Sequence, residues 1–226
     1  MRITLTTVFV FLFACCYAQQ LGQVTFSNGS NFSYFSFVTD QNVLIRVSND
    51  GKIMEWGTEA LAERSNFYAR KLQPFMGRID YYGPKDDSVF RGKVKSIGTC
   101  FFTYYDEYQK KSKAGKLKTI GSMLIDYFEE YEDKMLLGKI KTAGALSLDY
   151  YRSYDNESCR GKPKMIGSLP ITYYSVFDDK FNAGKLKSVG SVQYQWYSIG
   201  DRPEMRGSLK GNSYRQVISG ISFILN

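Results

Sequence analysis

The chain has 226 residues, a formal net charge of +8 and no histidine, so it lacks the commonest general base and the commonest metal ligand of proteins. Aromatic residues make up 16% of it, with 18 Tyr and 16 Phe. Together with frequent Thr, Ser, Val, Ile and regular Gly, this composition favours strands over helices. The lysines are spread along the chain, and no long basic block is present.

Residues 1–18 have the form of a secretory signal peptide. Arg2 supplies a positive charge, residues 3–14 are an apolar run, and Ala18 is the small residue before the expected cleavage point. An alternative is that residues 12–15 form a lipobox, with Cys15 as the lipidated first residue. We therefore expect an exported protein that is periplasmic, secreted or on the cell surface, either soluble or anchored at Cys15.

The exported chain keeps two cysteines, Cys100 and Cys159. An exported domain held together by disulfides usually carries more. The two residues also lie at different positions of the repeat described below. We expect both thiols to be free and partly buried.

Residues 19–76 predict an irregular β portion with one short helix. Asn28-Gly29 and Asn49-Asp50-Gly51 are expected turns, because Asn and Gly tolerate a positive φ. A helix of two or three turns is expected over residues 58–70, with Thr58 as its cap. Short strands are expected over residues 23–26, 31–38, 42–47 and 52–57.

Residues 77–226 predict an array of one repeated unit. Residues 184–191 read GKLKSVGS, and this phrase recurs without insertion or deletion. Its copies start at residues 92, 115, 138, 161 and 184 and, in a degenerate form, at 207, each 23 residues after the last. A half copy precedes Gly92. Self-similarity at a fixed period is the sequence signature of repeat architectures.

Each copy predicts a β-hairpin. A Gly followed by a small residue, as in Gly121-Ser122, favours a type II′ two-residue turn. A strand over residues 123–131 follows, and a polar turn then leads to the next copy. The turn sets a register in which the first glycine of a copy faces an aromatic residue of the same copy, whose ring would cover the bare backbone. The expected pairs are Gly92 with Tyr105, Gly115 with Phe128, Gly138 with Tyr151, Gly161 with Tyr174, and Gly184 with Tyr197.

The same register places two lysines of each copy on one face, beside a row of Tyr and Trp. Their stems would lie along the rings while the ammonium groups stay in water. This face predicts a surface for an anionic glycan, lipopolysaccharide or a membrane surface, and its rings would also suit sugar stacking. The alternative is a solvated face that keeps an extended sheet soluble. The candidate ligand residues are Lys116, Lys118, Lys139, Lys141, Lys185, Lys187, Tyr127, Tyr150, Tyr173 and Trp196.

A 23-residue hairpin with glycines and aromatics at fixed positions resembles the MORN-type repeat, and the Gly-Lys-Leu-Lys-Ser phrase resembles its bacterial variant. The resemblance covers about residues 92–220. It implies an all-β fold, an open curved antiparallel sheet of tandem hairpins, and a role as scaffold, membrane-associated module or peptide binder. Two alternatives are a β-solenoid, which would stack equivalent lysines about 4.8 Å apart, and a small outer-membrane β-barrel.

No nucleotide loop, zinc spacing or Ser/His/Asp set is present, and we expect no cofactor and no nucleic-acid partner. Carboxylates are plentiful, so a hydrolase that uses paired acids on polysaccharide is the rival hypothesis, and repeated acidic turns could hold calcium. We interpret Asp126, Asp149, Asp178 and Asp179 as turn formers and charge partners of lysine. The expected function is that of a non-catalytic binding or structural module of the cell envelope.

Overall fold

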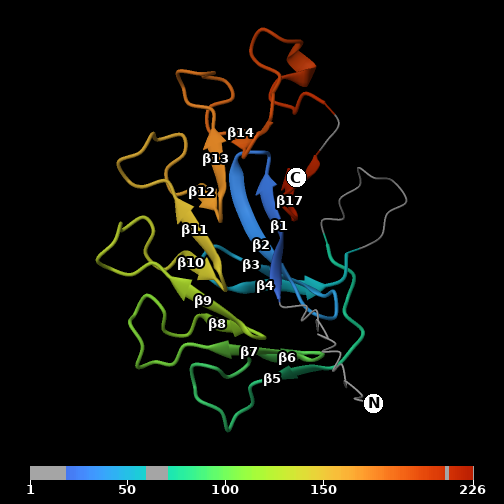
Figure 1. Cartoon of the computed structure of the whole chain (residues 1–226), viewed down its shortest axis with the longest axis vertical. Helices are drawn as coiled ribbons and strands as arrows, with labels where there is room; N and C mark the ends of the chain where they lie inside the picture. Colours follow the sequence, from blue (N-terminus) through green and yellow to red (C-terminus); the bar gives the residue numbers. More distant parts are fainter. Residues whose placement is uncertain (1–18, 60–70, 212–213, 226) are drawn as a thin grey trace, which may run out of the picture.

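The computed structural model describes residues 19–59, 71–211 and 214–225. The predicted signal peptide lies outside these residues, and so does the predicted helix beyond Glu59. Within them the chain is all-β, and its strands form two open sheets (Figure 1). The same residues contain no helix that is long and apolar enough to cross a membrane.

The two ends of the chain together build a six-stranded sheet with the order β16-β17-β1-β2-β3-β4. Its strands are β1 (Gln20–Ser27), β2 (Asn31–Val38), β3 (Leu44–Val47), β4 (Ile53–Gly57), β16 (Arg215–Ile218) and β17 (Ile221–Leu225). All neighbours are antiparallel except β1 and β17, which run parallel. The two expected turns are confirmed: Asn28 and Gly29 both have a positive φ, and Gly51 closes the β3–β4 hairpin with φ 84°.

The repeats form an eleven-stranded antiparallel sheet in simple sequence order from β5 to β15, which confirms the predicted array of tandem hairpins. A short 3-10 helix, η1 (Pro203–Met205), follows it. The strands are β5 (Ile79–Tyr81), β6 (Val94–Ile97), β7 (Cys100–Tyr104), β8 (Leu117–Ile120), β9 (Met123–Tyr127), β10 (Ile140–Ala143), β11 (Leu146–Tyr150), β12 (Pro163–Ile166), β13 (Leu169–Tyr173), β14 (Leu186–Val189) and β15 (Val192–Gln193). Residues 215–225 of the degenerate last copy belong to the other sheet.

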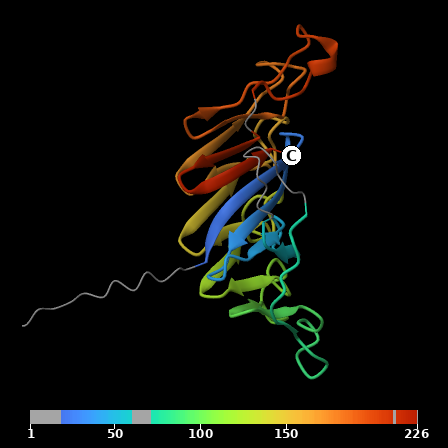
Figure 2. The same ribbon diagram turned by 90° about the vertical axis from the view of Figure 1, so that its right-hand side faces the viewer.

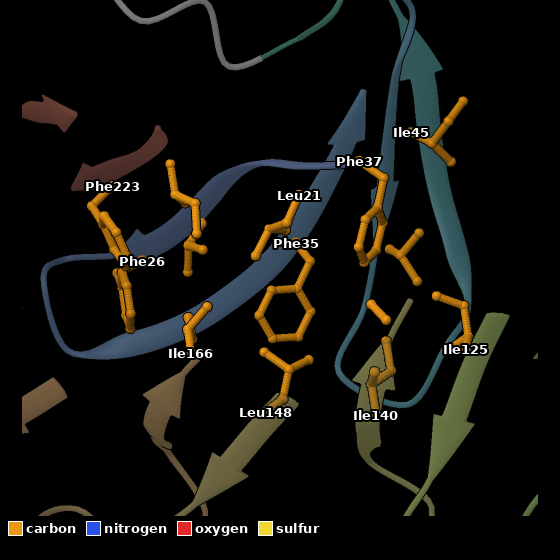
Figure 3. Packing of buried hydrophobic residues seen from close by; sticks show 14 of the residues in the cluster. Leu21, Phe26, Phe35, Phe37, Ile45, Ile125, Ile140, Leu148, Ile166 and Phe223 are labelled. Carbon is orange, nitrogen blue, oxygen red and sulfur yellow. The ribbon is translucent and has the colours of Figure 1, made fainter. Parts of the chain in front are cut away.

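The six-stranded sheet covers one face of the repeat sheet, and the hydrophobic core lies between the two layers (Figures 1 and 2). Figure 3 shows Phe35 above Leu148 and Phe26 above Ile166. The strand sequences explain this packing, since each presents apolar side chains on one face of the pleat. Sequence analysis did not predict this second layer.

Polar contacts also fix the position of the covering sheet over the repeats. The backbone N–H of Ile140 donates to the carbonyl oxygen of Asn49 at 2.7 Å, and that of Leu186 donates to Gly29 at 2.7 Å. Gln41 Oε1 accepts from the Thr99 N–H at 3.1 Å. Turns of the N-terminal strands therefore bind repeat backbone groups that the repeat sheet leaves without a partner.

The two-residue turns have the predicted geometry. In the first copy Ile97 faces Cys100 across the turn, and Gly98 has φ 58°, a conformation that glycine adopts without strain. Beyond the turn the register departs from simple alternation. A β-bulge recurs in the long-loop hairpins, so that Tyr127 pairs with Ile140 while Asp126 pairs with Thr142. Lys141 is the extra residue at this bulge.

Because of the bulge, the predicted face of the sheet is wrong for one lysine of each copy. The expected register placed Lys118 on the same face as Lys116 and the row of Tyr and Trp. Instead Leu117 and Ile120 both enter the core, and Lys118 is exposed on the other face. The extra residue reverses the side on which the following side chains point. The two predicted lysines of each copy therefore have different environments.

Candidate binding surface

The first lysine of each copy is half-buried, and its ammonium group contacts the backbone of the next copy. We call Lys93, Lys116, Lys139, Lys162 and Lys185 the inner lysines. The Lys139 ammonium lies 5.1 Å from the centroid of the Tyr150 ring, and its Nζ donates to the carbonyl oxygen of Gly161 in the next copy at 2.6 Å. The same pair of contacts occurs at all five inner lysines.

Burial lowers the pKa of every inner lysine. The prediction that these stems lie along aromatic rings is confirmed, but the ammonium groups, expected in water, are partly desolvated and hydrogen-bonded to the protein. Each ammonium instead connects two consecutive copies through a charge-assisted hydrogen bond. Lys116, Lys139 and Lys185, which were proposed as ligand contacts, therefore stabilise the packing of consecutive copies.

The predicted row of ligand-stacking rings is also internal. Tyr127 and Tyr150 are fully buried, and Tyr173 and Trp196 are nearly so. Tyr127 Oη donates to the carbonyl oxygen of Leu117 at 2.6 Å, and Trp196 Nε1 donates in the same way to Leu186 at 2.8 Å. These rings present no face to a ligand.

The expected pairing of each repeat glycine with a ring of its own copy is wrong. The N–H of Gly138 donates to the carbonyl oxygen of Phe128, ten residues earlier, at 2.9 Å. The position of an added Cβ at Gly138 lies 2.3 Å from Lys116 Nζ, with no ring atom among its three nearest neighbours. The expected register fails here because Gly138 closes the long loop with φ 73° and does not continue the strand of the turn.

The second lysine of each copy lies on the outer face. We call Lys95, Lys118, Lys141, Lys164, Lys187 and Lys210 the outer lysines. Lys118 Nζ lies 5.6 Å from the centroid of the Tyr105 ring. Lys141 also forms an ion pair with Glu132 at 3.0 Å, and Lys187 forms one with Asp178 at 2.6 Å. Of the three outer lysines proposed for ligand contact, Lys118 is the most exposed.

Of the four acidic residues interpreted as turn formers, Asp178 and Asp179 do make turns of the long loops, whereas Asp126 and Asp149 lie in β9 and β11. Asp178 Oδ2 accepts from the backbone N–H of Ser175 at 2.9 Å, and Asp179 Oδ1 accepts from Phe181 at 2.9 Å. The hydrogen bond from Lys187 and those from Ser175 lower the Asp178 pKa. Equivalent turn contacts recur at Asp155 and Asp201. No group of three metal-ligating side chains occurs among residues 19–59, 71–211 and 214–225.

Two carboxylates that approach each other share a cation. Lys113 Nζ lies 2.6 Å from Asp126 and 2.9 Å from Glu129. Hydrogen bonds from Lys110 and Lys113 lower the Glu129 pKa to about 2. A carboxylate held in this way is a poor general acid near neutral pH, because general acid catalysis needs a raised pKa. The pair therefore does not favour the hydrolase hypothesis.

The tips of the long loops carry a feature that sequence analysis missed. In four consecutive copies the same position holds an aromatic residue whose ring is almost fully exposed. These residues are Tyr108 (87% exposed), Tyr131 (75%), Tyr154 (81%) and Phe177 (91%); we call them the loop-tip row. Their loops lie one after another along one edge of the repeat sheet (Figure 1).

The sequence analysis placed the residues of the loop-tip row at the ends of predicted strands. Tyr131 ended the strand expected over residues 123–131, because aromatic residues favour strands, but β9 ends at Tyr127. The chain then turns through the N–H of Glu129, which donates to Glu132 Oε2 at 2.9 Å. The signal that could have revealed the row is the repetition of an aromatic one residue before the acidic turn position.

Cys100 and Cys159, the two cysteines of the described residues, are free, as expected, and buried. Burial raises the pKa of the Cys100 thiol to about 11, which keeps it protonated and unreactive near neutral pH.

Comparison with protein-family models, with curated proteins and with solved structures finds no match. The resemblance to MORN-type repeats stays a prediction.

Proposed function

We propose that this protein is a non-catalytic β-repeat module that binds a polysaccharide of the cell envelope along the loop-tip row. The observation that carries the proposal is one exposed ring at the same position of four consecutive copies. Large exposed apolar side chains that repeat in this way exceed what a solvated surface needs. Adjacent loops are two strands apart, about 10 Å at the sheet, so one extended chain molecule can contact several rings.

The surroundings of the rings favour a sugar over a protein partner. Tyr108 stands between exposed Glu107 and Gln109, and Tyr154 lies between Ser153 and Asp155. A sugar ring offers an apolar face to an aromatic side chain and hydroxyl groups to neighbouring polar side chains. A protein partner would require a larger continuous apolar patch.

The charges favour a neutral glycan. Taken together, residues 106–114, 129–137, 152–160 and 175–183 contain ten carboxylates and seven Lys or Arg, although the first of these loops alone has two carboxylates and three lysines. The inner lysines contact backbone carbonyl groups, and Lys141 and Lys187 contact carboxylates. An anionic glycan, lipopolysaccharide or a membrane surface would therefore meet a net negative charge over these four loops.

The proposed location follows from the sequence of residues 1–18. We propose export followed by residence at the envelope, either as a chain beginning at Gln19 or as a lipoprotein beginning at Cys15. The intact mass of the protein recovered from envelope and soluble fractions distinguishes these two forms, because a lipidated Cys15 adds acyl chains and four residues.

The test of the binding proposal is sedimentation of the protein with insoluble neutral polysaccharides, namely cellulose, chitin and a β-1,3-glucan. The variant carries Tyr108→Ser, Tyr131→Ser, Tyr154→Ser and Phe177→Ser together. We expect the parent to bind one of the three and the variant to bind it at least tenfold more weakly. Loss of about 1–3 kcal/mol over the row corresponds to such a change.

A matched control replaces Lys95 and Lys118 by Gln on the outer face and should bind like the parent. Heparin retention with salt elution provides the anionic comparison. Failure of the parent to bind any of the neutral polysaccharides, or equal binding by the quadruple serine variant, would contradict the proposal. Retention on heparin that depends on Lys95 and Lys118 would favour the anionic surface instead.

A further inference from the structure

A cavity of about 390 Å³ lies where the six-stranded sheet ends over the first copies of the repeat. Its walls come from β4 and the turn before it, and from β5, β6 and β7 with the segments beside them. β4 is an edge strand, so the covering layer stops beside this point. The volume lies in the range typical of small-molecule sites.

The lining of the cavity is mainly apolar and aromatic. Trp56 and Ile53 project from the covering sheet, and Val94, Tyr81 and Tyr104 come from the repeats. Over the middle copies Phe26 and Phe35 cover the core face of the repeat sheet (Figure 3). At the first copies Tyr81 remains about half exposed and Trp56 only half-buried. This end of the core therefore leaves space that side chains do not fill.

The charged groups at the cavity are unbalanced. Three ammonium groups, those of Lys52, Lys93 and Lys116, line it with a single carboxylate, that of Asp50. Lys93 and Lys116 are inner lysines and use one donor each on the carbonyl oxygens of Gly115 and Gly138. An ammonium group has three donors. Further hydrogen bonds are therefore available to an anion in the cavity.

Desolvation makes this arrangement favourable for an anion. Burial lowers the pKa of Lys93 and of Lys116, which means that their charged forms are under-compensated in the free protein. An anionic group placed beside them would form charge-assisted hydrogen bonds in a partly desolvated site. The apolar walls would hold an apolar body attached to that group.

We propose that this cavity binds a small amphipathic anion, with its carboxylate at Lys93 and its apolar part against Trp56, Ile53 and Val94. This site is separate from the loop-tip row and independent of polysaccharide binding. The ligand class is a carboxylate that carries an alkyl chain or an apolar ring.

The test uses decanoate as the probe and decanol as the uncharged control of the same chain length, both below micelle-forming concentrations. The protein carries Trp196→Tyr, which leaves Trp56 as the only tryptophan and places at 196 the residue that other copies have. We expect decanoate to change the Trp56 fluorescence in a saturable manner and decanol to bind at least tenfold more weakly. Loss of one charged hydrogen bond, about 1.5–3 kcal/mol, corresponds to such a factor.

Two variants and one control connect the binding to the cavity. Lys93→Met should weaken decanoate binding about tenfold, and Ile53→Phe should abolish it by filling the space while leaving the lysines in place. Lys185→Met removes an inner lysine at the other end of the array and should leave the affinity unchanged. Thermal unfolding shows whether each variant is folded, and Ile53→Phe decides the question if Lys93→Met does not fold. The proposal is overturned by absence of saturable decanoate binding, by equally tight decanol binding, or by equal weakening in Lys185→Met.

Discussion

Tyr127 and Tyr150 occupy the same position in consecutive copies, but their hydroxyl groups differ in what they contact. Both side chains are fully buried. Tyr127 Oη donates to Leu117, while Tyr150 Oη has no hydrogen-bond partner within the described part of the chain. A buried polar group without a partner costs free energy. The repeat has therefore kept the ring at residue 150 for its packing.

This difference predicts opposite outcomes for the same substitution. Tyr127→Phe should lower the free energy of unfolding by about 1 kcal/mol, because it removes a hydrogen bond and leaves the Leu117 carbonyl without that donor. Tyr150→Phe should leave stability unchanged or raise it. Urea unfolding of the two variants and the parent measures both effects. An equal loss in the two variants would show that Tyr150 has a partner.

At the scale of the repeat, the turn and the strands could be predicted from the sequence, whereas the bulge could not. Gly98 and its equivalents stand between apolar runs and thereby indicate the two-residue turn. The bulged residue, such as Lys141, resembles any polar strand residue. Strict alternation therefore assigned Lys118 to the wrong face and the glycines to the wrong partner. The exposed Tyr131 was placed in a strand because propensity does not show where a strand ends.

The contact between an inner lysine and the next copy's glycine leads to a second prediction. Gly92 and Gly138 have nearly the same positive φ, 75° and 73°. An added Cβ at Gly138 would lie 2.3 Å from Lys116 Nζ, whereas at Gly92 it would meet no described atom within 4 Å. Gly92→Ala should therefore cost only the left-handed backbone strain, about 1–2 kcal/mol.

Gly138→Ala should cost more than Gly92→Ala, because it also displaces the Lys116 ammonium from its carbonyl acceptor. Displacing a charged hydrogen bond adds about 1.5–3 kcal/mol. Denaturant unfolding of both alanine variants gives the comparison. If the two cost the same, the lysine-to-glycine contact contributes nothing to stability.

At the scale of the whole molecule, the decisive contact joins the two ends of the chain. β1 and β17 pair in parallel, with Val24 opposite Phe223. A pairing between residues so far apart in sequence has no local signal, and this is why the covering layer could not be predicted. The array itself needs that layer, because a single sheet would expose Ile125, Leu148 and Ile166 to water. The two-layer fold leaves the loop-tip row outside the core and the cavity beside the edge strand of the covering sheet.

The shared core also predicts how the whole molecule responds to alkaline pH. Burial raises the pKa of many tyrosines, among them Tyr127 and Tyr150. The pKa of Tyr151 and that of Tyr194 are raised to about 12. Below the ordinary tyrosine pKa of 10.0, both the folded and the unfolded chain hold these protons, and stability does not depend on them. Above pH 10 the unfolded chain loses protons that the folded chain retains, so stability falls as pH rises toward 12 and beyond.

The inner lysines act in the other direction, because their lowered pKa lets the folded chain lose protons before the unfolded chain does. They are fewer than the shifted tyrosines, and we expect the net free energy of unfolding to stay level from about pH 7 to 9 and to drop above pH 10. Urea unfolding at each pH, followed by circular dichroism, measures the curve. Tyr151→Phe should make the drop shallower, whereas Tyr154→Phe, which changes an exposed loop-tip ring, should not. If the free energy of unfolding instead rises above pH 10, the lowered pKa values of the inner lysines outweigh the raised pKa values of the buried tyrosines.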